Sequence, residues 1–63
     1  MPGPVDPSRY EGLPYDDAAE VAVGDGWHVR RREPGGVYTM EYRPDRLNLD
    51  VDDAGVVVRA VVG

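Results

Sequence analysis

The sequence contains too few reactive side chains to form an active site. His28 is the only histidine, Ser8 is the only serine, and cysteine is absent. Covalent catalysis needs a nucleophile, a base beside it and a third group that orients the base. Ser8 lies in a proline-rich stretch that predicts an extended or disordered segment. We therefore expect no catalytic residues, no enzyme activity and no cofactor.

An acidic run over residues 50–55 resembles the beginning of a calcium-binding loop. Its twelfth position is Val61, whereas that position in a calcium loop holds a bidentate glutamate. We interpret the run as a turn between two strands, because aspartate and glycine favour turns. The triplet Arg30-Arg31-Arg32 could contact an anion, but a charged strand edge that hinders aggregation is the preferred interpretation. We expect no metal site.

Length and composition favour a small binding domain over a protein with a deep cleft. The chain has 63 residues, is rich in valine and lacks phenylalanine, which favours strands. So small a core can hardly enclose a ligand pocket of roughly 300–1,000 Å³. The 12 acidic residues against 7 arginines give a net charge of −5, which argues against nucleic-acid binding.

The chain shows no membrane-spanning run and no signal-peptide pattern. We expect a cytoplasmic protein, or a secreted one if a signal peptide was removed, with no membrane partner. We expect a monomer, although the sheet edge of so small a domain leaves a dimer open.

The hydrophobic pattern predicts one helix and three strands after a flexible N-terminal tail over residues 1–12. Residues 17–23 are good helix formers with acidic residues in the first turn, and the Gly24-Asp25-Gly26 segment ends the predicted helix. Strands are predicted over Trp27–Arg32, Arg46–Val51 and Val56–Val62 from their alternating side chains. One helix packed on a small sheet is an α+β architecture.

Residues 37–45 lie between two predicted strands and do not have the composition of a normal turn. They include bulky side chains and no glycine, and Pro44 restricts the end of the segment. We expect an extended, ordered loop. Within and after it, Thr39–Arg43 and Pro44–Asn48 form a motif that resembles the potato inhibitor I family, which includes chymotrypsin inhibitor 2 and eglin c. The motif looks closest to the small bacterial and fungal elastase-inhibitor relatives of that family.

The resemblance covers about residues 13–63 and implies an α+β fold with one short helix on a small mixed β-sheet and a long exposed binding loop. It implies inhibition of a serine protease with an apolar primary pocket, of the subtilisin, chymotrypsin or elastase type. Met40 would fill that pocket, and Met40–Glu41 would be the reactive bond. The residues of the protease-binding loop would be Val37, Tyr38, Thr39, Met40, Glu41, Tyr42 and Arg43.

Loop support is expected from Arg46, Asn48 and Arg43. Arg46 and Asn48 alternate with Leu47 and Leu49, so their side chains should leave the core and point to the underside of the loop. The guanidinium of Arg46 can donate several hydrogen bonds, including charge-assisted ones to Glu41. Plant members of the family have a second arginine where this chain has Asn48. A non-inhibitory protein-interaction module on the same fold is the alternative.

Overall fold

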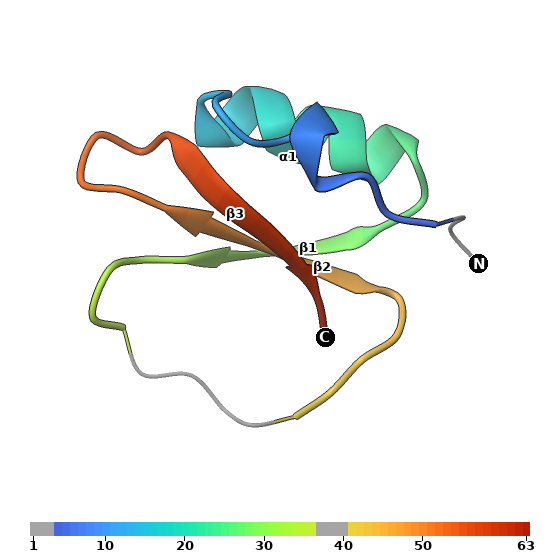
Figure 1. Cartoon of the computed structure of the whole chain (residues 1–63). Helices are drawn as coiled ribbons and strands as arrows, with labels where there is room; N and C mark the ends of the chain where they lie inside the picture. The colour runs from blue at the N-terminus through green and yellow to red at the C-terminus, as the bar shows by residue number, and fades with distance from the viewer. Residues whose placement is uncertain (1–3, 37–40) are drawn as a thin grey trace.

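An α-helix lies across one face of a three-stranded sheet (Figure 1). The computed structural model describes residues 4–36 and 41–63. Its elements are the 3-10 helix η1 (Pro7–Arg9), the helix α1 (Tyr15–Gly24) and the strands β1 (His28–Arg32), β2 (Arg46–Val51) and β3 (Val57–Val62). The predicted α+β class with a mixed sheet is confirmed. Neither described helix is long and apolar enough to cross a membrane.

The sheet has the order β1-β2-β3, with β2 parallel to β1 and antiparallel to β3. A parallel pair cannot be joined by a tight hairpin, because the chain has to travel back along the strand before it pairs again. The segment 33–45 makes this connection, and its described parts, residues 33–36 and 41–45, lie on the side of the sheet away from α1 (Figure 1). The parallel pairing of β1 and β2 is therefore what makes the loop long.

The helix α1 begins at Tyr15, two residues before the predicted start. The side chain of Pro14 offers no cap, but the carbonyl of Gly55 accepts a hydrogen bond of 2.9 Å from the Tyr15 amide. At the other end Gly26 has a φ of 96°, which favours glycine, and the Trp27 amide donates to the Ala22 carbonyl at 3.0 Å. The first amide of the helix is thus satisfied by a carbonyl of the turn between β2 and β3, which is far from it in the sequence.

The core lies between α1 and the sheet. Ala18 and Ala22 are fully buried on the inner face of the helix, where their small side chains let it approach the strands closely. Leu47 and Leu49 of β2 are also fully buried beneath it. The remaining buried apolar side chains are Tyr10, Trp27, Val51, Val57 and Ala60.

The N-terminal segment differs from the expected flexible tail in its second half. Tyr10 is almost fully buried and belongs to the core. The Gly12 amide donates to the carbonyl of Val57, and the Val57 amide donates to the carbonyl of Leu13, both at 2.8 Å. A tyrosine in a proline-rich stretch can bury more than 150 Å² when a partner surface is available, and the edge of β3 supplies that surface. Residues 7–12 consequently pack as part of the domain.

Candidate functional site

Two proline turns bound the loop between β1 and β2. In the first, the Gly36 amide donates to the Glu33 carbonyl at 3.1 Å, and Gly35 has a φ of 70°. Proline at the second position and glycine at the third, as in Pro34-Gly35, are typical of a type II turn. In the second, the Arg46 amide donates to the Arg43 carbonyl at 3.2 Å, with a proline again at the second position. Both ends of the loop are thereby fixed.

The described part of the predicted binding loop is exposed. Glu41, Tyr42 and Arg43 are all exposed, and the Tyr42 side chain has 69% of its surface accessible. The other predicted loop residues, Val37, Tyr38, Thr39 and Met40, lie outside the described residues. Of the predicted reactive bond, the structure therefore describes the Glu41 side.

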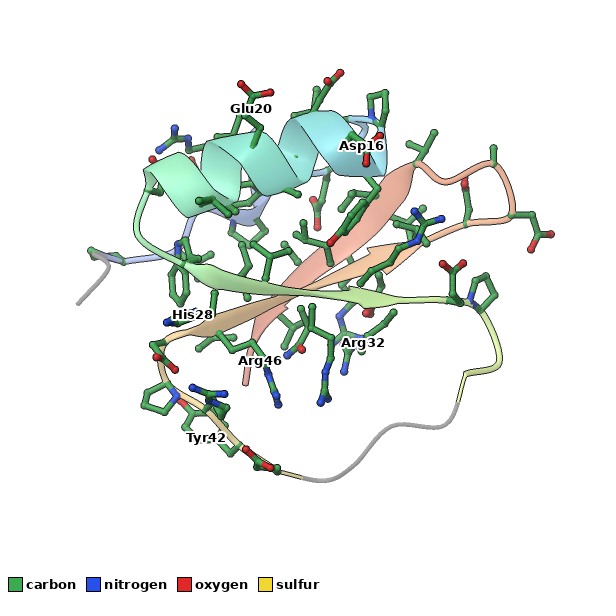
Figure 2. All side chains as sticks on the ribbon, turned by 180° about the vertical axis from the view of Figure 1, so that it is seen from behind. Asp16, Glu20, His28, Arg32, Tyr42 and Arg46 are labelled. Carbon is green, nitrogen blue, oxygen red and sulfur yellow. The ribbon has the colours of Figure 1, made fainter. Side chains whose placement is uncertain are left out.

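Arg46 connects the loop to the body of the domain. Its side chain lies on the face of the sheet away from α1 (Figure 2) and retains only 8% of its accessible surface. The Nη2 atom donates to the carbonyl oxygen of Glu41 at 2.7 Å, and Nε donates to the carbonyl oxygen of Gly63 at 2.7 Å. In return the Gly63 amide donates to the Arg46 carbonyl at 3.0 Å. The described bond to Glu41 thus goes to its main-chain carbonyl. The charge-assisted bond expected from the sequence would go to its carboxylate.

Asn48, two residues along β2, points to the same face and has only 4% of its surface exposed. Its Nδ2 donates to the carbonyls of Val61 at 3.2 Å and Gly63 at 2.9 Å. Arg46 and Asn48 do leave the apolar core as predicted, but their positions are not solvent-facing. Both are buried, with carbonyls of the loop and the end of β3 as hydrogen-bond acceptors. The central strand is therefore buried on both faces.

Charged groups gather at the end of the loop where it joins β2. The Asp45 carboxylate lies 3.5 Å from Nε2 of His28 and 3.6 Å from Nε of Arg43. The main chain adds a hydrogen bond of 2.9 Å from the His28 amide to the Asp45 carbonyl. The Arg43–Asp45 ion pair is partly exposed and contributes little stability, so its structural effect is to direct the Arg43 side chain back to the stem of the loop.

The comparison with protein families places this loop in context. The model of the peptidase inhibitor I78 family matches residues 7–63, which is nearly the whole chain. The chain belongs to this family. It is thus a peptidase inhibitor and not an enzyme, and its partner is a protease. The matching model is that of the I78 family and not specifically that of the potato inhibitor I family, which the loop motif resembles. No curated protein matches the chain significantly.

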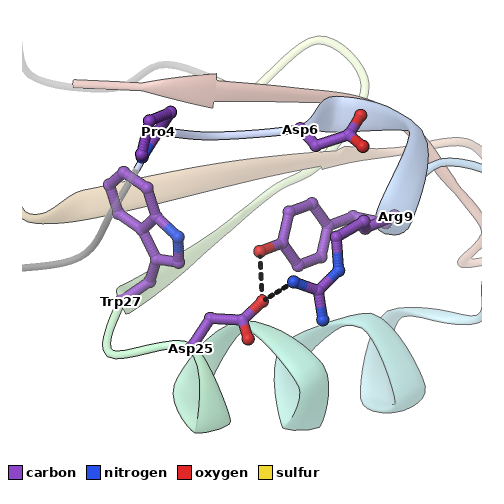
Figure 3. A pocket seen from close by; sticks show the side chains of 6 residues that line it. Pro4, Asp6, Arg9, Asp25 and Trp27 are labelled. Atoms are coloured by element: carbon purple, nitrogen blue, oxygen red, sulfur yellow. Dashed lines mark hydrogen bonds and ion pairs between the residues drawn. The ribbon is translucent and has the colours of Figure 1, made fainter.

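Elsewhere, this I78 family member has a cavity of about 190 Å³ beside the N-terminal segment (Figure 3). There Asp25 accepts a hydrogen bond of 2.8 Å from the Tyr10 hydroxyl and pairs with Arg9 at 3.0 Å. Burial, and then the hydrogen bond to Asp25, raise the pKa of Tyr10 above its ordinary value of 10.0. These groups satisfy one another, so the cluster anchors the segment 7–12 to the end of α1. Among residues 4–36 and 41–63, no three acidic or histidine side chains gather to hold a metal ion.

Sequence reasoning missed one residue of the I78 inhibitor's loop support, Gly63. Its carbonyl oxygen accepts hydrogen bonds from both Arg46 and Asn48. The ring of Tyr42 also lies so near that a Cβ atom on Gly63 would be 3.5 Å from its Cδ2. Every residue has a main-chain carbonyl, so the amino-acid type does not reveal which one acts as an acceptor. Only the antiparallel pairing of β2 with β3 could have indicated the position of Gly63.

Proposed function

We propose that the segment Val37–Arg43 inhibits a serine protease as a slowly cleaved substrate, with Met40–Glu41 as the reactive bond. The proposed target has an apolar primary pocket, of the subtilisin, chymotrypsin or elastase type. The resemblance of the loop motif to the potato inhibitor I family motivates the choice of bond. Methionine is apolar and flexible, which suits such a pocket.

The hydrogen bond from Arg46 to the Glu41 carbonyl is the observation that carries this proposal. When a serine protease attacks Met40, the serine Oγ bonds to the Met40 carbonyl carbon and the Glu41 nitrogen leaves as an amine. The protease's histidine takes the serine proton and gives it to that nitrogen. Glu41 would stay bound to Arg46 through its own carbonyl, so the new amine would remain close to the acyl group.

A retained amine favours resealing of the bond over its hydrolysis. Groups held in reactive geometry behave as though present at very high concentration, which rises to about 10⁵–10⁸ M in well-oriented systems. An ordered loop also avoids the loss of side-chain freedom on binding, about 0.5–1.5 kcal/mol for each immobilised side chain. Tight binding and slow turnover then have the same cause, the fixed position of the loop.

Titration of the protein against subtilisin, chymotrypsin, pancreatic elastase and trypsin tests the proposal. We expect stoichiometric, reversible inhibition of at least one of the first three. Trypsin should not be inhibited, because its acidic pocket requires a cation. Mass spectrometry of the inhibited mixture should show intact chain together with chain cut only between Met40 and Glu41. Rapid digestion by subtilisin, chymotrypsin and elastase, with none of them slowed, would refute it.

A further inference from the structure

The two described stems of the loop, residues 33–36 and 41–45, lie at opposite ends of β1. The Asp45 carbonyl accepts a hydrogen bond from the His28 amide at the start of β1, and the first turn of the loop begins directly after Arg32. Both stems are fixed in the described part of the chain. A side chain in the middle of β1, on the face away from α1, therefore lies between the two stems.

Arg30 occupies this position. In the register of the parallel pair His28 faces Arg46, Arg30 faces Asn48 and Arg32 faces Asp50. Residues opposite one another in neighbouring strands project to the same face, so Arg30 shares the face of Arg46 and Asn48. Neighbouring strands lie about 4.7–4.9 Å apart in a sheet, so Arg30 is a direct neighbour of Asn48.

The neighbouring side chains Arg32 and Asn48 donate their described hydrogen bonds to groups outside the loop. Arg32 is committed to Asp50, with Nη2 donating to Oδ2 at 3.0 Å and Nε to Oδ1. Asn48 directs its described hydrogen bonds to carbonyls at the end of β3, not to the loop. Among the described residues the Asn48 Oδ1 atom is buried and has no donor. From β2, the described side-chain hydrogen bond to residues 41–45 thus comes from Arg46.

Arg30 itself is held in place. It is half-buried although arginine is among the residues most often exposed. It also takes part in at least one polar or ring interaction. An arginine can donate five hydrogen bonds from a planar group, and a carbonyl-rich loop offers acceptors to such a group.

We propose that Arg30 is a second positioning residue for the loop, which it supports from β1 as Arg46 does from β2. This inference rests on the proposed function only for its consequence, slower cleavage. The placement of the loop by Arg30 is a property of the free protein. Two arginines on adjacent strands would hold the loop against rotation about a single anchor.

Hydrogen exchange and cleavage of Arg30→Ala test the inference. We expect the amides of Gly36 and Arg46, which donate to the carbonyls of Glu33 and Arg43 in the two stems of the loop, to exchange about 10- to 100-fold faster than in the parent, as for the loss of charge-assisted hydrogen bonds. Amides of the rest of β2, residues 47–51, should change much less. In the protease assay, the Met40–Glu41 bond should be hydrolysed faster by a similar factor.

Arg59→Ala is the matched control, because Arg59 is an exposed arginine on β3 that faces Asp50 in the register. It should exchange and be cleaved like the parent. Arg30→Lys, which keeps the charge but loses the planar fork, should recover part of the protection. Loop exchange in Arg30→Ala equal to that in Arg59→Ala would overturn the inference, as would equal acceleration throughout β2, which would indicate a general loss of stability. A parent that inhibits no protease would refute the proposed function and leave the exchange result to decide on Arg30.

Discussion

The Nη2 atom of Arg46 lies 2.7 Å from the carbonyl oxygen of Glu41, and the Nε atom of the same side chain lies 2.7 Å from the carbonyl oxygen of Gly63. One planar group therefore joins the loop to the end of the last strand. Because the guanidinium is buried, each bond replaces water that the group has lost, and neither partner can move without leaving a polar group unsatisfied. The position of Glu41 is in this way tied to the sheet.

Replacing Arg46 by alanine should release this connection. We expect Arg46→Ala to lose about 1–3 kcal/mol of unfolding free energy, because the loop and the end of the chain lose the two hydrogen bonds that the buried guanidinium donates to the Glu41 and Gly63 carbonyls. Hydrolysis at Met40–Glu41 by the inhibited protease should be at least about tenfold faster. Urea denaturation and mass spectrometry measure the two effects. Val51→Ala, a core variant away from the loop, controls for lost stability, and equally fast cleavage in that variant would show that general unfolding causes the cleavage.

Met40 should determine which protease is bound. Met40→Lys is expected to gain inhibition of trypsin, whose pocket supplies a carboxylate for the ammonium group. It should lose at least about tenfold in affinity for proteases with an apolar pocket, where the charge has no partner. Inhibition constants for trypsin and subtilisin provide the measurement, and Met40→Leu serves as the apolar control. Unchanged constants in Met40→Lys would exclude Met40 as the specificity residue.

Tyr10 should make stability fall at alkaline pH. Its pKa is raised in the folded state, so the folded protein holds the phenolic proton more tightly than the unfolded chain does. The resulting stabilisation is fully present below the ordinary pKa of 10.0 and is lost as the pH rises through the higher pKa of the folded state. Tyr10→Phe should therefore show a weaker decline in unfolding free energy between about pH 9 and 11. Tyr42→Phe, at an exposed tyrosine, should decline like the parent; an identical slope in Tyr10→Phe would contradict the assignment.

The close approach of α1 to the sheet should depend on its small residues. Ala22 has no exposed surface, whereas the neighbouring Val23 is 62% exposed. We expect Ala22→Leu to lower the unfolding free energy by about 1–3 kcal/mol through overpacking. Val23→Leu should change it by less than about 0.5 kcal/mol, as is usual for exposed positions. Thermal denaturation of both variants compares them, and similar melting temperatures would show that the helix can move outward at little cost.

Much of the architecture follows from local patterns in the sequence. The alternation of Leu47, Leu49 and Val51 predicts β2 with the bounds that the structure has, because side chains in a strand alternate between two faces. Pro34-Gly35 predicts a turn for an equally local reason, the backbone preferences of proline and glycine. The α+β class follows from the number and order of such segments.

Contacts between distant segments were decided by the tertiary structure. The residue types around Tyr10 predict a tail, and its burial depends on the free edge of β3, about fifty residues away in the chain. Arg46 and Asn48 follow the outward alternation, and that alternation specifies only that they leave the core. Whether an outward face meets solvent or another segment depends on the parallel pairing of β1 with β2, which brings the stem at residues 41–45 back to that face. For that reason the sequence predicts only that the Arg46 side chain leaves the core, while its acceptors, the main-chain carbonyls of Glu41 and Gly63, became visible only in the folded chain.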